Sequence, residues 1–245
     1  MDKFNEQTVY KFLFLAFILS FSLAISAEEA FYNELPTKSE VKRPPSPEEN
    51  SSPSVVIKKA SQMRSPGAAA SINSTVEQIR QRGFREVNDE DLLYLSLDYI
   101  APQFTPIEEI VGNTTTPLST FLNIPGIFRK MELIGSIAKG PTKEKNSWTQ
   151  ISRYYYLSNG SILMFSEFDY VAAKISTAFP EELVNQKIND SPAMLITLKS
   201  TNGKYVSKLT WFTVDKLYSL HITDRAIGDG VTKQLVALAQ GIQQP

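Results

Sequence analysis

The chain has 245 residues, 42% of them hydrophobic and 11% aromatic, which is enough apolar material for a globular core and excludes a wholly disordered chain. Its 25 basic and 26 acidic side chains nearly balance, so nucleic acid is not expected as a partner. Because the chain has no cysteine, disulfides, thiolate metal sites and cysteine nucleophiles are excluded.

A charge-free apolar run occupies residues 12–27 and ends in a sharply polar segment. The run is short for a membrane-spanning helix, and its small C-terminal residues favour peptidase cleavage after Ala27. Val9 and Tyr10 would extend it into an uncleaved anchor. We therefore expect residues 1–27 to be a signal peptide or a signal anchor. The protein would be exported to the periplasm or the outer face of the inner membrane, and only an uncleaved leader would attach it there.

Residues 28–70 are expected to form a disordered linker. They contain six prolines among serine, glutamate and lysine, and one apolar island at Val55–Ile57. The simplest interpretation is a spacer. Pro44–Pro47 would also suit a groove that binds polyproline II helices, and residues 55–59 would suit addition to a partner as an edge strand.

Residues 71–117 are expected to be helical and irregular. Ser74 to Glu77 fits a capping box, which predicts a short helix ending at Gly83, with Phe84 folding back onto it. Residues 92–100 combine an acidic helix start with a strict strand alternation, so both structures stay open there.

Two strand-rich meanders follow in residues 118–245. Residues 152–158 and 161–170 flank Asn159-Gly160, the dipeptide typical of a type I′ hairpin turn, which would give Asn159 a positive φ. Residues 128–138 are expected to supply the preceding strand.

The second meander is expected between residues 182 and 224. Its strands are predicted over residues 193–200, 204–213 and 217–223. In the last strand Leu217, Ser219 and His221 would share the more polar face, with His221 exposed.

An amphipathic helix is predicted at the C-terminus, where apolar residues recur at helical spacing from Val231 to Ile242. The expected fold class is therefore α+β, an antiparallel meander sheet of about six strands packed by the C-terminal helix, with one or two short N-terminal helices. The second face of the sheet would need the N-terminal helices or a partner to cover it.

Residues 118–245 resemble a bacterial extracytoplasmic domain family of unknown function. The resemblance is carried by the entry at Leu118, Pro125 and Phe128 with Met131-Glu132-Leu133, by the hairpin of residues 154–160, by the step from Ile188 to Ala193, and by Leu209–Phe212 followed by Leu217–Leu220. It implies a sheet-plus-helix half-barrel similar to periplasmic envelope-stress regulators and lipoprotein carriers.

Candidates for catalysis are few. His221 has no second histidine with which to bind zinc, and no G-x-S-x-G motif accompanies it. Glu167 and Asp169 would share one strand face, as paired acid–base carboxylates do, but the polar face of a sheet produces the same pattern. Residues 89–91 are interpreted as a helix start, and residues 228–230 as a loop before the last helix. We expect no catalytic residue, no metal and no cofactor.

The remaining candidate site is a group of aromatic side chains, which could line an apolar cavity or form a partner-binding face. The simpler interpretation is that these side chains pack in the core. Its residues are Tyr154, Tyr156, Phe165, Trp211, Phe212 and Tyr218. The function expected first is a non-enzymatic envelope module that binds a protein partner or acts as a sensor. The alternatives are a carrier or sensor of a lipid or other apolar ligand, and a subunit of a secretion or conjugation apparatus.

Overall fold

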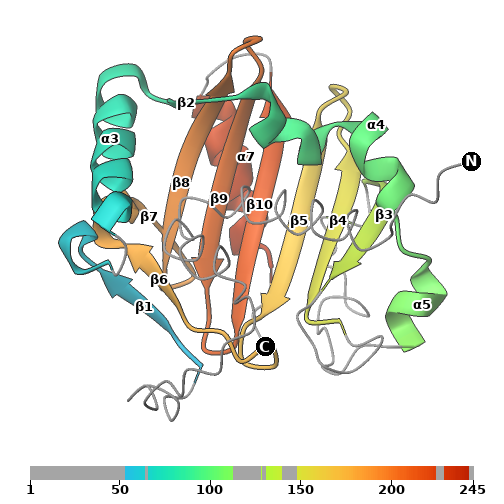
Figure 1. Ribbon diagram of the computed structural model, residues 1–245. Helices are drawn as coiled ribbons and strands as arrows, with labels where there is room; N and C mark the ends of the chain where they lie inside the picture. The colour runs from blue at the N-terminus through green and yellow to red at the C-terminus, as the bar shows by residue number, and fades with distance from the viewer. Residues whose placement is uncertain are drawn as a thin grey trace, which may run out of the picture.

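A computed structural model describes residues 53–63, 66–112, 128, 131–139, 148–224 and 229–242. It shows a mixed α+β fold in which one large twisted sheet carries few helices (Figure 1). The predicted leader, most of the predicted linker and residues 113–127 lie outside the described residues.

Six antiparallel strands form the body of the sheet, in the spatial order β8-β9-β10-β5-β4-β3. The two predicted meanders are joined side by side, because β10 pairs with β5 and places Leu220 opposite Phe165. The strands are β3 (Glu132–Lys139), β4 (Gln150–Tyr156), β5 (Ile162–Asp169), β8 (Ser191–Ser200), β9 (Tyr205–Phe212) and β10 (Lys216–Asp224).

Two further strands make the sheet eight-stranded and mixed, which corrects the expected all-antiparallel sheet of about six strands. β2 (Arg85–Val87) runs parallel to β8, and β7 (Gln186–Ile188) pairs antiparallel with the other end of β8. Both are three residues long and follow helical segments, so their alternation is too short to be visible in the sequence.

The apolar island at residues 55–57 belongs to the fold, so the linker boundary expected at residue 70 lies too far along the chain. It forms β1 (Val55–Lys58), which pairs in parallel with β6 (Thr177–Pro180) of this same chain. A short helix, η1 (Ala60–Gln62), follows, and the backbone N–H of Ala60 donates to the carboxylate of Glu182 in helix η5 (Glu181–Leu183).

Helix α3 (Pro66–Arg82) begins eight residues before the capping box that was expected to start it. Its first turns contain alanines, which have a high helix propensity. They favour a helix there even though apolar residues do not recur at helical spacing. The predicted end is confirmed, because Gly83 has φ +79° and its N–H donates to the Ile79 carbonyl. Phe84 makes its ring contact with Tyr205 of β9, 5.9 Å away.

The open question at residues 92–100 is settled as helix. The segment forms η2 (Asp89–Leu95) and α4 (Leu97–Ile100), followed by η3 (Ala101–Gln103) and α5 (Ile107–Gly112). The predicted acidic helix start is confirmed, since the Asn88 N–H donates to the Asp91 carboxylate at 3.1 Å. Burial within this segment follows a helix and not a strand. Leu92 and Leu95, three residues apart, are buried, whereas Leu93 is exposed.

Helices cover both faces of the sheet (Figure 1). The back face packs on α7 (Asp229–Gln240), where the predicted residues Leu235 and Leu238 are buried together with Ile242. The front face packs on α3, η2 and α4 through Ile72, Leu95 and Ile100 among others. Asp229 and Gly230 are already helical, whereas a loop was expected there.

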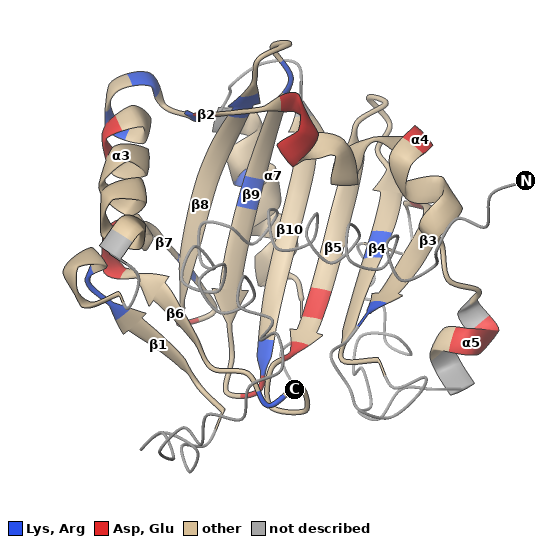
Figure 2. Ribbon diagram, in the orientation of Figure 1, with Lys and Arg blue, Asp and Glu red and all other residues tan. Residues whose placement is uncertain are grey.

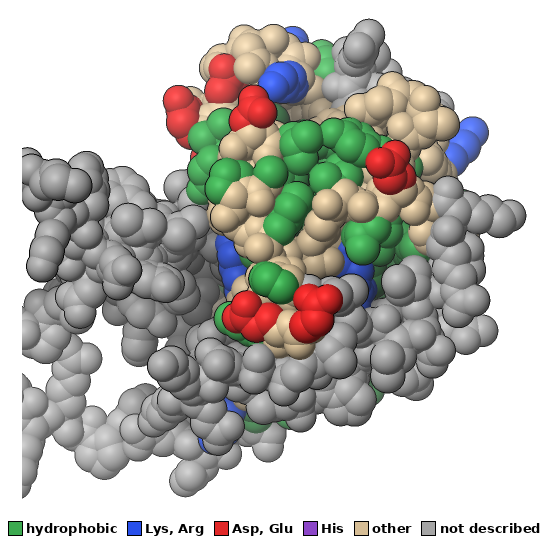
Figure 3. Space-filling model, turned by 90° about the vertical axis from the view of Figure 1, so that its right-hand side faces the viewer, with side chains coloured by type: hydrophobic (Ala, Val, Ile, Leu, Met, Phe, Trp, Pro, Cys, Tyr) green, Lys and Arg blue, Asp and Glu red, His purple; other side chains and the backbone are tan. Residues whose placement is uncertain are grey.

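Two of the sheet's edge positions are closed by local packing. The Thr105 N–H donates to the Ser136 carbonyl and its hydroxyl accepts from the Ala138 N–H, so Thr105 caps part of the outer edge of β3. The ring of Phe104 lies over Gly135, where a Cβ atom would come within 2.4 Å of it. Seen from this edge, apolar side chains stand between acidic ones, and Leu133 is 42% exposed (Figure 3).

Candidate functional site

The front face of the central strands is organised in rows of side chains that run across neighbouring strands. Leu217, Ser219 and His221 share this face, and Tyr218 and Leu220 share the back face, as the alternation predicted. The first row contains Ile162, Thr223 and Val206, the second Met164, His221 and Lys208, the third Ser152, Ser166, Ser219 and Thr210, and the fourth Phe168, Leu217 and Phe212.

A pocket of about 290 Å³ lies over the first row, between η2 and the tips of the β4–β5 and β8–β9 hairpins. Its volume is at the lower limit of small-molecule sites, which typically hold about 300–1,000 Å³. The residues around it are Asp89, Leu92, Leu93, Leu95, Ser96, Asn159, Gly160, Ser161, Ile162, Ser200, Asn202, Lys204, Val206 and Thr223.

The two hairpin tips that form the pocket rim have the same turn. In each, a glycine with positive φ donates its N–H to the carbonyl three residues earlier, Gly160 (+79°) to Leu157 and Gly203 (+85°) to Ser200, both at 2.9 Å. This pattern is a type I turn followed by a left-handed glycine.

The hairpin at Asn159-Gly160 is therefore confirmed, but its predicted type I′ turn is wrong, because Asn159 has no positive φ. Its side chain instead accepts a hydrogen bond from the Ser161 N–H at 3.0 Å. The two adjacent positive φ values that a type I′ turn needs occur at Asn189 and Asp190, between β7 and β8.

Asp89 fixes η2 against the β8–β9 tip. One of its carboxylate oxygens accepts hydrogen bonds from the Thr201 hydroxyl at 2.8 Å and from the Asn202 N–H at 3.0 Å. The hydrogen bond from the Asn202 backbone, followed by that from Thr201, holds the pKa of Asp89 below its ordinary value. Two segments more than 100 residues apart in the chain are thus joined at the pocket.

The pocket has an apolar interior and a polar rim. Leu92, Leu95 and Val206 are buried, and Leu93 is 39% exposed at the mouth. Hydroxyl, amide and ammonium groups of the hairpin tips surround this interior, Lys204 among them. An apolar cavity with a few convergent polar groups is the usual form of a binding site.

The second row, which follows the first along the strands, brings two basic side chains together. Lys208 and His221 are direct cross-strand neighbours and are 7% and 2% exposed. His221 Nδ1 lies 2.9 Å from the Tyr94 hydroxyl, and Nε2 is buried without a hydrogen-bond partner among the described residues. The expected exposed histidine is therefore wrong, because η2 brings Tyr94 onto its ring at 5.3 Å.

Burial controls the ionisation of this row. Desolvation, reinforced by the nearby Arg85 charge, lowers the pKa of Lys208 to about 8. Desolvation and then the Lys208 charge lower the pKa of His221 well below its ordinary value, so His221 is neutral at pH 7. The basic position on β9 and the acidic residues of η2 are visible in Figure 2.

The third row is a stripe of hydroxyl groups that satisfy one another. The Ser152 hydroxyl donates to Ser166 at 3.0 Å, and the Gln150 amide donates to the same oxygen at 2.9 Å. Thr210 and Ser219 lie 3.4 Å apart. These side chains are all buried.

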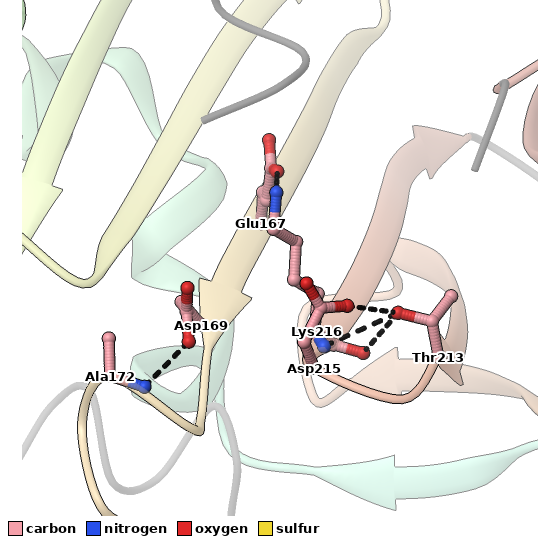
Figure 4. A network of polar contacts seen from close by, with 6 residues as sticks. All are labelled: Glu167, Asp169, Ala172, Thr213, Asp215 and Lys216. Carbon is pink, nitrogen blue, oxygen red and sulfur yellow. Dashed lines mark hydrogen bonds and ion pairs between the residues drawn. The ribbon is translucent and has the colours of Figure 1, made fainter. Parts of the chain in front are cut away.

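Glu167 and Asp169 share the back face, as predicted, but they are buried instead of lying on a polar outer surface. Lys216 Nζ donates to Glu167 Oε1 at 2.8 Å, and Asp169 accepts from the Ala172 N–H at 2.7 Å (Figure 4). His221 lies on the opposite face, so the three side chains considered for catalysis do not converge.

The six aromatic residues proposed as one cavity or partner face are divided between the two faces. On the back face Trp211 and Tyr218 stack at 5.3 Å, and Phe165 lies 6.3 Å from Tyr218. On the front face Tyr154 contacts Phe104, and Phe212 contacts Phe179 at 5.0 Å. Tyr156, the sixth, ends β4 and is half-buried. None of the six lines the pocket described above.

The sequence did not identify the pocket residues. A usable signal was the repeated Ser/Thr-Asn-Gly triplet at 158–160 and 201–203, which marks two equivalent tips.

Comparisons with protein families, curated proteins and solved structures found no match to this chain. Within the described ranges, no cluster of three or more His, Cys, Asp or Glu side chains is placed to hold a metal ion. The helices of the same ranges include none that is long and apolar enough to cross a membrane.

Proposed function

We propose that this chain is a non-enzymatic binding module of the cell envelope and that its pocket receives an apolar side chain presented by a protein partner. The observation that carries the proposal is the composition of the pocket, with buried leucines inside and hydrogen-bonding groups at the mouth. An extended partner segment could place one side chain inside while its backbone meets Asn159, Asn202 and Ser161.

A binding role is also supported by the separation of His221 from Glu167 and Asp169, because these three side chains do not meet at the pocket. Export through residues 1–27, location in the envelope, the resemblance to extracytoplasmic half-barrel domains and a place in a secretion apparatus belong to this proposal as expectations from the sequence.

A short acyl chain is the second candidate occupant, and the volume of the pocket favours it over a whole lipid. At about 290 Å³ the pocket lies at the lower limit of small-molecule sites, which suits one side chain or a short acyl chain better than a whole lipid.

The test uses two neutral probes, N-acetyl-leucine amide for the peptide and octan-1-ol for the acyl chain, titrated into the full-length protein. Ser161→Trp fills the pocket mouth, and Ser158→Trp on the same hairpin tip is its control, because Ser158 does not line the pocket. We expect S161W to abolish binding of the preferred probe and S158W to leave it unchanged. Equal binding by all three proteins would refute the proposal.

A further inference from the structure

Two loops at the end of the sheet opposite the pocket expose apolar side chains. The first, residues 170–176, follows β5, and the second, residues 213–215, joins β9 to β10. They are neighbours because the start of β10 pairs with the end of β5. Val214 is 91% exposed, more than any other large apolar side chain in the described ranges, and Val171 is 42% exposed. We call these two segments the valine loops.

The valine loops and the pocket lie at opposite ends of the same strands. β5 and β9 each begin at a hairpin tip of the pocket and end at one of the valine loops. Each strand has eight residues, so the two ends are about 25 Å apart. A surface at the valine loops is therefore separate from the pocket.

Hydrogen bonds hold the valine loops together. The Tyr170 hydroxyl of the first loop donates to the Thr213 carbonyl of the second at 2.9 Å and also contacts the Val214 carbonyl. Within the first loop, the Ile175 N–H donates to the Tyr170 carbonyl at 2.9 Å. The valines are thus presented on a fixed scaffold, which reduces the entropy lost when they are buried.

The charges of the valine loops favour a negatively charged, apolar surface as their partner. Lys174 is exposed, whereas Asp215 is partly buried and accepts from the Thr213 hydroxyl at 3.0 Å. The Asp169 carboxylate, at the end of β5, is buried and accepts from the Ala172 N–H (Figure 4). Exposed valines beside a lysine match a bilayer that contains anionic lipid, in which apolar groups enter the acyl boundary and ammonium groups meet the headgroups.

The chain enters the domain beside the valine loops. The Ser54 N–H donates to the Ser176 hydroxyl at 3.2 Å, and the Ser54 carbonyl accepts from the Thr177 N–H at 3.0 Å. β1 therefore starts at the end of the sheet where β9 and β10 are joined (Figure 1). Residues 28–52 of the expected linker separate this point from the predicted leader, and a coil of about 25 residues spans roughly 25–30 Å. A leader kept in the membrane would hold this end of the domain close to the bilayer.

We propose that the valine loops contact the membrane surface, with Val171 and Val214 in the headgroup region of an anionic bilayer and Lys174 against its phosphates. The proposal rests on the envelope location proposed above and on a leader that stays uncleaved. Two valines and one lysine bind a bilayer weakly by themselves, but a short tether makes the contact intramolecular and raises its effective concentration. The pocket then faces away from the membrane, toward a partner.

A single-site label tests this contact, because the chain has no cysteine of its own. Ala172→Cys carries the fluorophore NBD on the first valine loop, and Ser158→Cys carries it on the β4–β5 tip at the pocket end; both positions are exposed. Each full-length protein is reconstituted into POPC vesicles that contain POPG and nitroxide-labelled acyl chains. We expect the nitroxides to quench the label at position 172 and not the label at position 158. Attachment by the leader alone would quench neither.

A charge substitution then identifies the side chain that makes the contact. Val214→Asp in the A172C protein places a carboxylate where the bilayer would bury a valine, so the ratio of lipid-contacting to free label should fall roughly tenfold. Leu133→Asp is the matched control, because Leu133 is also exposed but lies at the pocket end of β3. It should leave the quenching unchanged. Lys174→Glu should reduce the quenching on vesicles with POPG and much less on POPC alone.

The absence of quenching at position 172, or equal quenching with and without V214D, would overturn the proposal. A label that is silent on lipid vesicles but shielded in native envelope membranes would assign the valine loops to a protein partner instead. If the full-length protein does not stay with the vesicles, the envelope location fails together with this proposal.

The pocket is tested separately, because its probes bind at the other end of the sheet. If S161W still blocks probe binding but no lipid contact is found, the membrane proposal is wrong and the binding pocket stands. If the lipid contact is found and no probe binds, the pocket proposal is wrong and the membrane contact stands.

Discussion

At the scale of single residues, Lys208 is a charge that the fold holds at the expense of stability. Its pKa in the folded state, about 8, lies below the ordinary value of 10.5, so the unfolded chain binds the proton more tightly. The resulting loss of stability is fully present below pH 8, diminishes as pH rises from about 8 to 10.5, and is absent above that range.

Lys208→Met should therefore stabilise the protein at pH 7, by about 1–3 kcal/mol in the free energy of unfolding. Urea denaturation of wild type and variant at pH 7 and pH 10 measures this difference, and most of the gain should be gone at pH 10. Lys204→Met serves as the control with no comparable gain. A destabilised K208M at pH 7 would show that Lys208 is a structural residue.

The burial of His221 illustrates a tertiary contact that the sequence does not reveal. The alternation along β10 correctly placed His221 on the same face as Leu217 and Ser219. Its burial depends on Tyr94, which is 127 residues away in the chain, and no local pattern contains that contact.

At the scale of elements, the hairpin tips depend on left-handed glycines. Alanine at Gly160 or Gly203 has to adopt φ near +80°, so each substitution should cost about 1–2 kcal/mol in unfolding free energy. Asn159→Ala should cost less than either, because it removes only an exposed side-chain hydrogen bond to Ser161. Thermal denaturation of the three variants gives the comparison. Equal costs at Asn159 and Gly160 would contradict the assigned turn.

A second prediction at this scale concerns the edge strand β3. Gly135→Ala should destabilise the protein by about 1–3 kcal/mol, because the new methyl group meets the Phe104 ring. In a Phe104→Ala background the same substitution should cost far less, which a double-mutant cycle measures. An unchanged cost in that background would mean that Gly135 is required by the backbone, at the register shift between Leu133 and Gly135.

Elements with a strong local pattern were predictable, and those without one were not. The alternation of apolar residues identified the six central strands, and helical spacing identified the C-terminal helix. The start of α3 was missed because residues 66–70 have no hydrophobic spacing, and β1 was missed because its pairing partner β6 lies more than 100 residues away.

At the scale of the whole molecule, the pocket exists because three distant segments meet. The β5–β10 pairing brings the tips of the two meanders together, and Asp89 then attaches η2 across them. Neither meander alone contains the site, so the sequence predicted the parts of the sheet without their junction.

The Asp89 contact should stabilise both the fold and the pocket. Asp89→Asn keeps the shape of the side chain and removes its charge, so it should weaken the hydrogen bonds from Thr201 and Asn202 and lower the free energy of unfolding. Because the pKa of Asp89 is lowered by these bonds, its contribution is present above the ordinary pKa of about 3.8 and is lost as pH falls below it. Denaturation at pH 7 and pH 3 checks both statements, and an equal difference between wild type and D89N at the two pH values would contradict them.

The most direct test of the pocket as a binding site is the position at which a ligand binds. Octan-1-ol and N-acetyl-leucine amide should be titrated into uniformly ¹⁵N-labelled full-length protein while amide chemical shifts are followed. We predict that the largest changes occur at Leu93, Ser161 and Val206, around the pocket. Changes confined to the α7 face, near Trp211 and Leu235, or no saturable change at all, would contradict the account.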